Sequence, residues 1–423
     1  MTKGPRQETM EYILDNGFRI ICAPSTSEVV YCGIAVDAGT RDERNEESGI
    51  AHFTEHLSFK GTCRRTARQI INSMESVGGD LNAYTGKEET VYYSAFLRRH
   101  LPRAIDTLLD IVMCSVYPQR EMDKEVEVVV DEIESYNDQP GELIYDEFEE
   151  LLFGTHPLGR NILGKADVLR TMKSADIQAF TRRMYTPDRM VLYVYGNVNP
   201  AEVLRLVDRC MDRISWQPAT EGVVFGRQSP ILGGQDVTAG GNVVVRTKGT
   251  HQAHVMMGTV GFGGSDPRHL HLYLLNNILG GPGMGSRLNL SLRERRGLVY
   301  TVESASVAYT DCGVWSVYFG CDGHDVERCM RLVRGELARL ADAPMTQRTL
   351  DAARRQLKGQ IGVAYDNGEN VALGMAKRYL HYGTTQSMQQ LFDRLDSLTP
   401  QALQATACEV FDPSSLTTLI YSR

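Results

Sequence analysis

The chain has 423 residues, of which 42% are hydrophobic and 23% are charged. This length and composition indicate two or three folded domains, and they exclude a minimal binding module or a wholly disordered chain. The net charge of −8, from 45 basic and 53 acidic residues, argues against nucleic acids and anionic membranes as partners.

The nine cysteines are scattered along the chain, and none has the Cys-x-x-Cys spacing. We therefore expect reduced thiols, rather than a disulfide framework or a cysteine-based zinc site. The first residues lack the apolar core of a signal peptide, and no apolar run approaches the roughly 20 residues that a membrane-spanning helix needs. These features predict a cytoplasmic protein.

The first half of the chain predicts a mixture of strands and helices. Strands are expected at 18–23 and 29–38, helices at about 47–59 and 66–77, paired strands at 81–85 and 90–97, a helical region at about 101–150, and a strand at 190–195. Pro118 and Pro140 should interrupt the long helical region.

The second half repeats this order of elements. Strands are expected at 253–262, 299–309, 314–319 and 416–421, and helices at about 269–279, 325–341 and 347–382. Residues 216–241 are rich in Gly, Gln, Pro and Thr without a sustained period, which is typical of a linker. We therefore predict an α+β protein with two tandem homologous domains, 1–215 and 242–423, each an antiparallel-rich sheet packed against helices.

The motif with the clearest chemistry is His52-Phe53-Thr54-Glu55-His56. On a helix, two histidines four residues apart lie on one face, where both rings can bind one Zn²⁺. Glu55 lies in the same arc, so its carboxylate could take a proton from water at the metal. The alternative is an ordinary polar helix face that happens to carry these residues.

A catalytic zinc needs a third protein ligand, and the helical segment 125–136 supplies two candidates. On a helical wheel with Glu125 at 0°, Glu132 falls at about 340°, so both acids border the apolar side of the helix. Glu127 and Glu134 fall on the opposite side and should be solvated. Periodicity alone does not choose between Glu125 and Glu132.

Four segments, 49–62, 81–85, 156–164 and 292–300, closely resemble the inverted-motif zinc peptidases of the pitrilysin, insulin-degrading enzyme and mitochondrial processing peptidase family. The resemblance runs in family order from about residue 15 to the C-terminus, and it implies a processing-peptidase-like metallohydrolase fold. It also implies His52, His56 and Glu132 as zinc ligands, Glu55 as the general base that activates a zinc-bound water, and Glu125 as an acid that orients a ligand histidine.

The same resemblance assigns residues to substrate binding. Asn82 and Ala83 would pair with the substrate backbone at a sheet edge. Arg293 would hold the substrate main chain, and Tyr300 would donate to the developing oxyanion. The helix of the second half that corresponds to the zinc helix has no histidine pair, which implies one Zn²⁺ per chain.

The leading hypothesis is a zinc metalloendopeptidase that hydrolyses peptides or short unfolded segments inside a dimeric chamber. Two alternatives remain: a peptidase that processes one specific precursor, and a non-catalytic scaffold subunit of a heterodimer. Because the chain has the half-length form of this family and carries both sets of residues, a homodimer is the simplest expectation. A heterodimer with an inactive homologue is the other.

Overall fold

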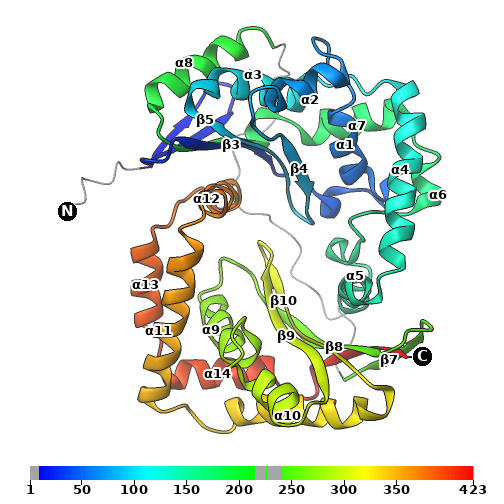
Figure 1. Ribbon diagram of the computed structural model, residues 1–423, viewed down its shortest axis with the longest axis vertical. Helices are drawn as coiled ribbons and strands as arrows, with labels where there is room; N and C mark the ends of the chain where they lie inside the picture. The colour runs from blue at the N-terminus through cyan, green and yellow to red at the C-terminus, as the bar shows by residue number, and fades with distance from the viewer. Residues whose placement is uncertain (1–8, 215–224, 226–240, 423) are drawn as a thin grey trace. The chain divides into compact units, whose positions relative to one another are not determined.

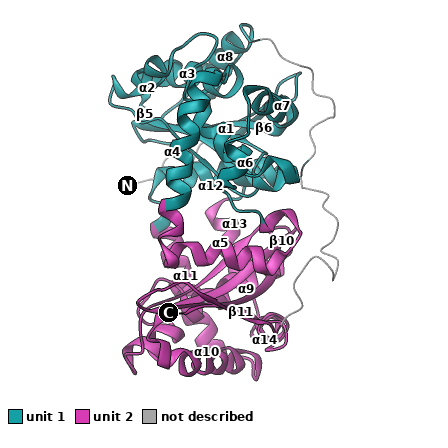
Figure 2. Cartoon of the chain, turned by 90° about the vertical axis from the view of Figure 1, so that its right-hand side faces the viewer, with its two compact units in different colours: residues 1–134, 160–225, 364–386 teal, residues 135–159, 226–363, 387–423 magenta. Residues whose placement is uncertain are grey.

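The computed structural model describes residues 9–214, 225 and 241–422. They form two compact units, coloured separately in Figure 2. The first unit comprises residues 1–134, 160–225 and 364–386, and the second comprises 135–159, 226–363 and 387–423. Most of the predicted linker, 216–241, lies outside the described residues. No helix in the described part is long and apolar enough to cross a membrane.

The first unit is built on a six-stranded sheet with the order β1-β2-β6-β3-β5-β4. Only β2 and β6 run parallel. The strands are β1 (Met10–Ile13), β2 (Arg19–Pro24), β3 (Val29–Val36), β4 (Asn82–Thr85), β5 (Thr90–Leu97) and β6 (Met190–Gly196). The helices are α1 (Ile50–Ser58), α2 (Ala67–Glu75), α3 (Leu101–Met113), α4 (Gln119–Asn137), α6 (Ala166–Leu169), α7 (Ser174–Met184), α8 (Pro200–Met211) and α12 (Gly368–Tyr382).

The second unit is built on a five-stranded sheet with the order β7-β11-β8-β10-β9, in which only β7 and β11 run parallel. Its strands are β7 (Val243–Thr247), β8 (Ala253–Phe262), β9 (Val299–Ala308), β10 (Cys312–Cys321) and β11 (Thr417–Ser422). Its helices are α5 (Pro140–Phe153), α9 (Arg268–Gly280), α10 (Val326–Ala341), α11 (Gln347–Ala364), α13 (Met388–Asp396) and α14 (Pro400–Val410), with a π-helix at Asn289–Glu294.

The two sheets share one topology, which confirms the predicted duplication. β2-β6-β3-β5-β4 corresponds strand for strand to β7-β11-β8-β10-β9, including the single parallel pair. The helix after the third strand of each series is α1 in the first unit and α9 in the second (Figure 1). The fold is therefore α+β with two homologous domains.

Successive strand residues point to opposite faces of a sheet, and both faces are packed against helices. In the first unit, Leu192 and Val194 pack in the core formed with α1, α3, α7 and α8, whereas Val191 and Tyr193 pack against α12. In the second unit, α5 covers the corresponding face, with Phe148 and Leu152 packed near Leu419.

The compact units do not coincide with the two halves of the sequence. Residues 135–159, from the first half, belong to the second unit, and residues 364–386, from the second half, belong to the first. The prediction of one helix over 347–382 is wrong, because the structure has two helices there, α11 and α12. The side chain of Asn367 accepts from Glu369 N–H at 2.9 Å and caps the N-terminus of α12. The two helices belong to different units.

Candidate metal and catalytic site

The helix α1 begins at a site that only glycine fits. Gly49 has φ +88°, and a Cβ there would lie 2.8 Å from the carbonyl oxygen of Leu163 and 2.9 Å from Cα of Gly164. Both constraints exclude a side chain. Leu163 and Gly164 are the last two residues of the family-like stretch 156–164, so part of that stretch has a structural role in placing α1.

Glu43 caps the N-terminus of the same helix, and the sequence analysis missed it. Its carboxylate accepts hydrogen bonds from Gly49 N–H and Ala51 N–H, both at 3.0 Å. Burial raises the pKa of Glu43 to about 8, although both backbone donors oppose that rise. An acidic residue shortly before a predicted helix was the available signal.

His52 and His56 lie one turn apart on α1, with ring centroids 4.7 Å apart. Glu132, from α4, meets both rings: its Oε2 lies 3.9 Å from His52 Nε2 and 3.5 Å from His56 Nε2. The three ligand atoms lie within 4.8 Å of one another. The structure therefore brings together the three residues that the resemblance implies as zinc ligands.

These separations fit a metal ion better than hydrogen bonds. Ligand atoms about 2.0–2.1 Å from one tetrahedral Zn²⁺ stand about 3.4 Å apart, close to the spacing of these three atoms. Burial, with His56 nearby, lowers the pKa of His52 to about 3, so its ring is neutral and offers a lone pair. His52 Nδ1 is buried without a hydrogen-bond partner.

Glu125 contacts the outer nitrogen of a ligand histidine. Its Oε1 lies 3.0 Å from His56 Nδ1, and its Oε2 lies 2.6 Å from Lys60 Nζ. Burial acts to lower the pKa of His56, but the carboxylates of Glu125, Glu55 and Glu132 outweigh it and raise that pKa. The geometry thus separates the two acids that periodicity left equivalent, because Glu132 faces both Nε2 atoms and Glu125 lies behind one ring.

Glu55 lies on the same helix and is held by Thr85 of β4, whose hydroxyl donates to Glu55 Oε2 at 2.6 Å. Burial raises the pKa of Glu55, and the Glu132 carboxylate adds to that rise. A carboxylate with a raised pKa accepts a proton more readily near neutral pH. Thr85 had no assigned role in the sequence analysis.

Asn82 and Ala83 begin β4, the outermost strand of the first sheet, which pairs only with β5. Ala83 N–H donates to the side chain of Asn82 at 2.9 Å, so it is not used in the ladder with β5. An edge strand with a backbone donor outside its ladder can pair with another extended chain.

Arg293 and Tyr300 lie in the second unit, whereas the histidines lie in the first. Arg293 is in the π-helix, Tyr300 is in β9, and the guanidinium carbon is 5.7 Å from the ring centroid. Tyr300 is 80% exposed. The two residues are therefore close to each other, with the tyrosine ring in solvent.

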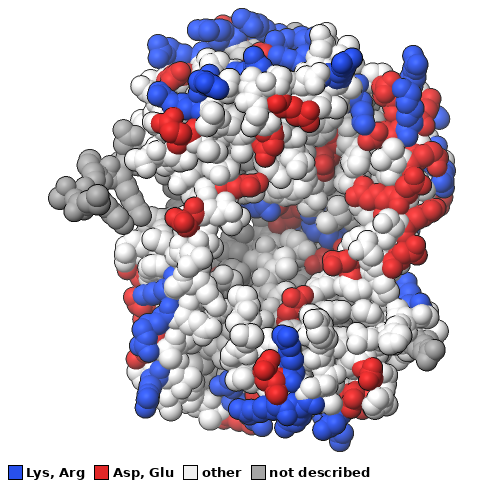
Figure 3. All heavy atoms as spheres, in the orientation of Figure 1, with Lys and Arg blue, Asp and Glu red and all other residues white. Residues whose placement is uncertain are grey.

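The helix α4 carries acids with different surroundings. Acidic side chains gather over the part of the surface where α4 runs (Figure 3). Asp123, Glu127 and Glu134 are exposed, as the wheel predicted for the last two, whereas Glu125 is buried. Only the acids turned toward α1 meet the histidines.

Comparisons with known proteins place the chain in a family. Residues 19–166 match the family described as insulinase, peptidase family M16, and residues 171–357 match the peptidase M16 inactive domain. An uncharacterized zinc protease of Streptomyces coelicolor is 34% identical over 94% of this chain and 86% of that protein. The uncharacterized zinc protease YmxG of Bacillus subtilis is 31% identical over 95% of each.

With these matches, the chain belongs to peptidase family M16, and both of these relatives are named zinc proteases. The fold agrees: a protease from Helicobacter pylori superposes with a TM-score of 0.89 at 22% identity, over 98% of this chain and 99% of that one. A structure from Pseudomonas fluorescens described as a peptidase M16 inactive domain superposes with a TM-score of 0.86 at 19% identity, over 98% of both chains.

Proposed function

We propose that this protein is a zinc-dependent endopeptidase of the cytoplasm that hydrolyses peptides or short unfolded segments. The observation that carries the proposal is the convergence of His52, His56 and Glu132 beside a half-buried carboxylate, Glu55, that is not part of the ligand group. Two imidazole nitrogens, one carboxylate and a separate acid are the set that a hydrolytic zinc site requires. The names of the relatives agree with zinc as the metal.

The protein's own residues have distinct roles in this proposal. Zinc, when bound, polarises the scissile carbonyl and makes water more acidic. Glu55 takes the proton from the attacking water and delivers it to the leaving amine, while Thr85 fixes one of its oxygens. Glu125 accepts from His56 Nδ1–H, which fixes the tautomer that presents Nε2 to the metal.

Substrate binding follows from the edge strand and from the second unit. We infer that a peptide adds to the open side of β4 beside Ala83, so main-chain hydrogen bonds supply affinity for many sequences. Arg293 would hold the substrate main chain, and Tyr300 would donate to the oxyanion. The exposure of Tyr300 leaves its hydroxyl free to meet a substrate.

The test combines metal analysis with a fluorogenic peptide assay. The purified protein should contain about one Zn²⁺ at this site and lose hydrolysis with a chelator, and zinc should restore it. Glu55→Gln should lower kcat by about 10²–10⁴-fold while zinc stays bound. Glu127→Gln, an exposed acid paired with Arg170, is the matched control and should be unaffected. Near-normal hydrolysis by Glu55→Gln would refute the proposed base.

We also propose that two copies enclose the substrate in a chamber. The chain carries both the proposed metal ligands and the arginine–tyrosine pair, so two identical copies suffice. Small-angle scattering and gel filtration should report a homodimer. A stable, fully active monomer would refute the chamber, and co-purification of an inactive homologue would replace the homodimer with a heterodimer.

Cleavage of an unbiased peptide library separates degradation from processing. We expect cuts in many sequences, because main-chain pairing at β4 does not depend on side chains. One sharp cleavage motif would instead indicate the maturation of a specific precursor.

A further inference from the structure

A second group of potential metal ligands lies in the first unit, apart from the histidine site. It consists of Cys63, in the loop between α1 and α2, and of Asp110 and Cys114 at the end of α3. Two short backbone links hold these segments together: Thr62 bridges to Ser115, and Cys63 N–H donates to Cys114 O at 2.9 Å. These links place Cys63, in the loop after α1, beside Cys114 at the end of α3.

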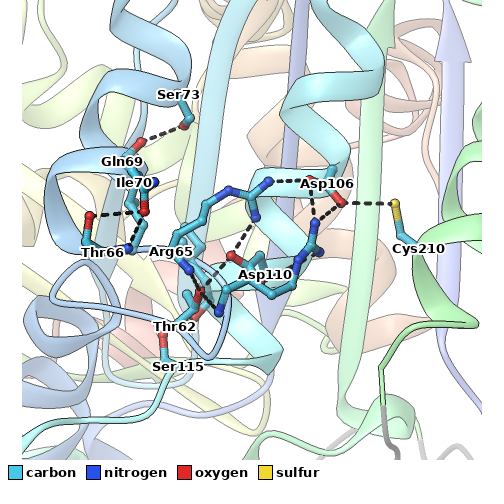
Figure 4. A network of polar contacts seen from close by, with 12 residues as sticks. Thr62, Arg65, Thr66, Gln69, Ile70, Ser73, Asp106, Asp110, Ser115 and Cys210 are labelled. Carbon is cyan, nitrogen blue, oxygen red and sulfur yellow. Dashed lines mark hydrogen bonds and ion pairs between the residues drawn. The ribbon is translucent and has the colours of Figure 1, made fainter.

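Asp110 is fully buried between these segments, and only one of its oxygens is satisfied. Its Oδ2 accepts from the Thr62 hydroxyl at 2.8 Å and from Arg65 at 2.5 Å, as Figure 4 shows. Its Oδ1 accepts no hydrogen bond and has only a long ion pair with Arg64, at 3.8 Å. A buried carboxylate oxygen without a partner is costly, and it leaves a coordination position free.

The spacing of the three side chains suits one soft divalent ion. The two Sγ atoms and a carboxylate oxygen of Asp110 lie within 4.8 Å of one another. Two sulfurs bound to a tetrahedral Zn²⁺ at about 2.3 Å stand about 3.7 Å apart, so only a small adjustment is needed. Thiolates select Zn²⁺ over Mg²⁺ and Ca²⁺, which prefer oxygen ligands.

The surrounding charge is compatible with bound thiolates. Arg64 and Arg65 form ion pairs with Asp106 and Asp110 beside the cluster, so these four charges cancel and the charge of two thiolates would be offset by the divalent cation itself. The two thiols also lie within hydrogen-bond reach of each other.

We propose that Cys63, Asp110 and Cys114 form a second zinc site, which ties the loop after the zinc helix α1 to the end of α3. Its fourth position is open to water, because Cys63 is exposed. Binding replaces two thiol protons with the cation and involves no change of oxidation state. The proposal departs from the sequence-based expectation of no cysteine-based zinc site, which rested on sequence spacing alone.

Cobalt substitution tests the site, because the His52–His56–Glu132 group contains no sulfur. We expect a sulfur-to-cobalt charge-transfer absorption in the wild type and its loss in Cys63→Ser and in Cys114→Ser. The band should persist in His56→Ala, which lacks the first site, and in the matched control Cys408→Ser, an exposed thiol of the second unit. Bound zinc should fall from about two to about one per chain in the two cysteine variants.

A wild-type measurement keeps the test decisive if a variant fails to fold. Zinc should protect Cys63 and Cys114 from alkylation in the reduced protein, while Cys408 reacts at an unchanged rate. Absence of the cobalt band with unchanged alkylation of Cys63 would overturn the proposal. So would a Cys63–Cys114 disulfide that persists under the reducing conditions of the zinc titration.

Discussion

The two acids on α4 differ in what they touch. Glu132 reaches both ligand rings, whereas Glu125 meets only the outer nitrogen of His56 and the ammonium group of Lys60. They are seven residues apart on one stripe of the helix, so the sequence pattern presents them alike. The position of α1 beside this stripe gives them different contacts.

This difference predicts the behaviour of Glu125→Gln. The amide keeps an acceptor for His56 Nδ1–H but loses the charge that favours the ring as a ligand, so zinc affinity should fall about 10–100-fold. A competition titration against a zinc-binding dye measures the affinity. Glu121→Gln, one turn earlier and paired with Lys124, should leave it unchanged. Equal affinities in the two variants would remove Glu125 from the site.

At the scale of elements, β4 contributes to the site twice. Thr85, its last residue, holds Glu55, and Ala83 has a backbone N–H outside the ladder with β5. The strand thus fixes the proposed base and offers a peptide an edge to pair with.

Ala83→Pro removes that N–H while proline remains tolerated on an edge strand. We expect KM for a peptide substrate to rise severalfold, with bound zinc and the unfolding midpoint nearly unchanged. Ala83→Ser, which keeps the N–H, is the control. If KM for Ala83→Pro equals that of the control, substrates do not pair at this position.

A cluster of charged and polar side chains, partly exposed at Lys377, holds α12 against the first sheet. Glu89 lies 2.6 Å from Lys377 Nζ and 3.2 Å from His381 Nε2. Arg19, which is buried, donates to the carbonyl oxygen of Leu380 at 3.0 Å, near the C-terminal end of α12. The Glu89–His381 contact joins residues 292 positions apart and the Arg19–Leu380 contact joins residues 361 positions apart, so no local pattern could predict them.

The cluster makes the stability of the first unit depend on acid pH. Burial alone would raise the pKa of Glu89, but His381 and Lys377 outweigh burial and lower it to about 2. Because this folded-state pKa is below the unfolded value, the stabilisation is present above pH of about 4.5 and is lost as pH falls toward about 2.

Glu89→Gln should remove this part of the pH dependence, on the order of 3 kcal/mol at neutral pH. Denaturant unfolding from pH 6 to pH 2, with hydrogen exchange at α12 amides, measures the effect. The exposed Glu46→Gln should unfold like the wild type. A Glu89→Gln profile parallel to the wild type would show that the ion pair does not stabilise α12.

At the scale of the whole molecule, each half of the sequence supplies one cover helix to the unit built by the other half. The face of the first sheet formed by Ile21, Val91 and Tyr193 is covered by Ala376 and Leu380 of α12. On the other sheet, α5 has the same role. Neither half can therefore bury both faces of its own sheet.

Separate expression of the halves tests this dependence. Residues 1–215 alone would expose the apolar face that α12 covers, so we expect aggregation and binding of a hydrophobic dye. Co-expression with 242–423 should restore a soluble complex, which also controls for the chain break. A monomeric 1–215 fragment with cooperative unfolding would show that α12 is dispensable for folding.

The sequence by itself determined the duplicated order of elements, the α+β class and the histidine–glutamate pattern on one helix. These are local properties, since strand alternation and helical period depend on neighbouring residues. Short elements with weak patterns were missed, among them β1, β7, α13 and α14.

Periodicity left Glu125 and Glu132 equivalent and only the family resemblance separated them; the tertiary structure shows which of them faces the histidines. Only the tertiary structure decided which helices cover which sheet, that Glu43 caps α1, and that two cysteines 51 residues apart lie side by side. Periodicity fixes the direction in which a side chain points from its own element. It carries no information on the distance to a residue in another element, and that distance determines whether ligands converge on one ion.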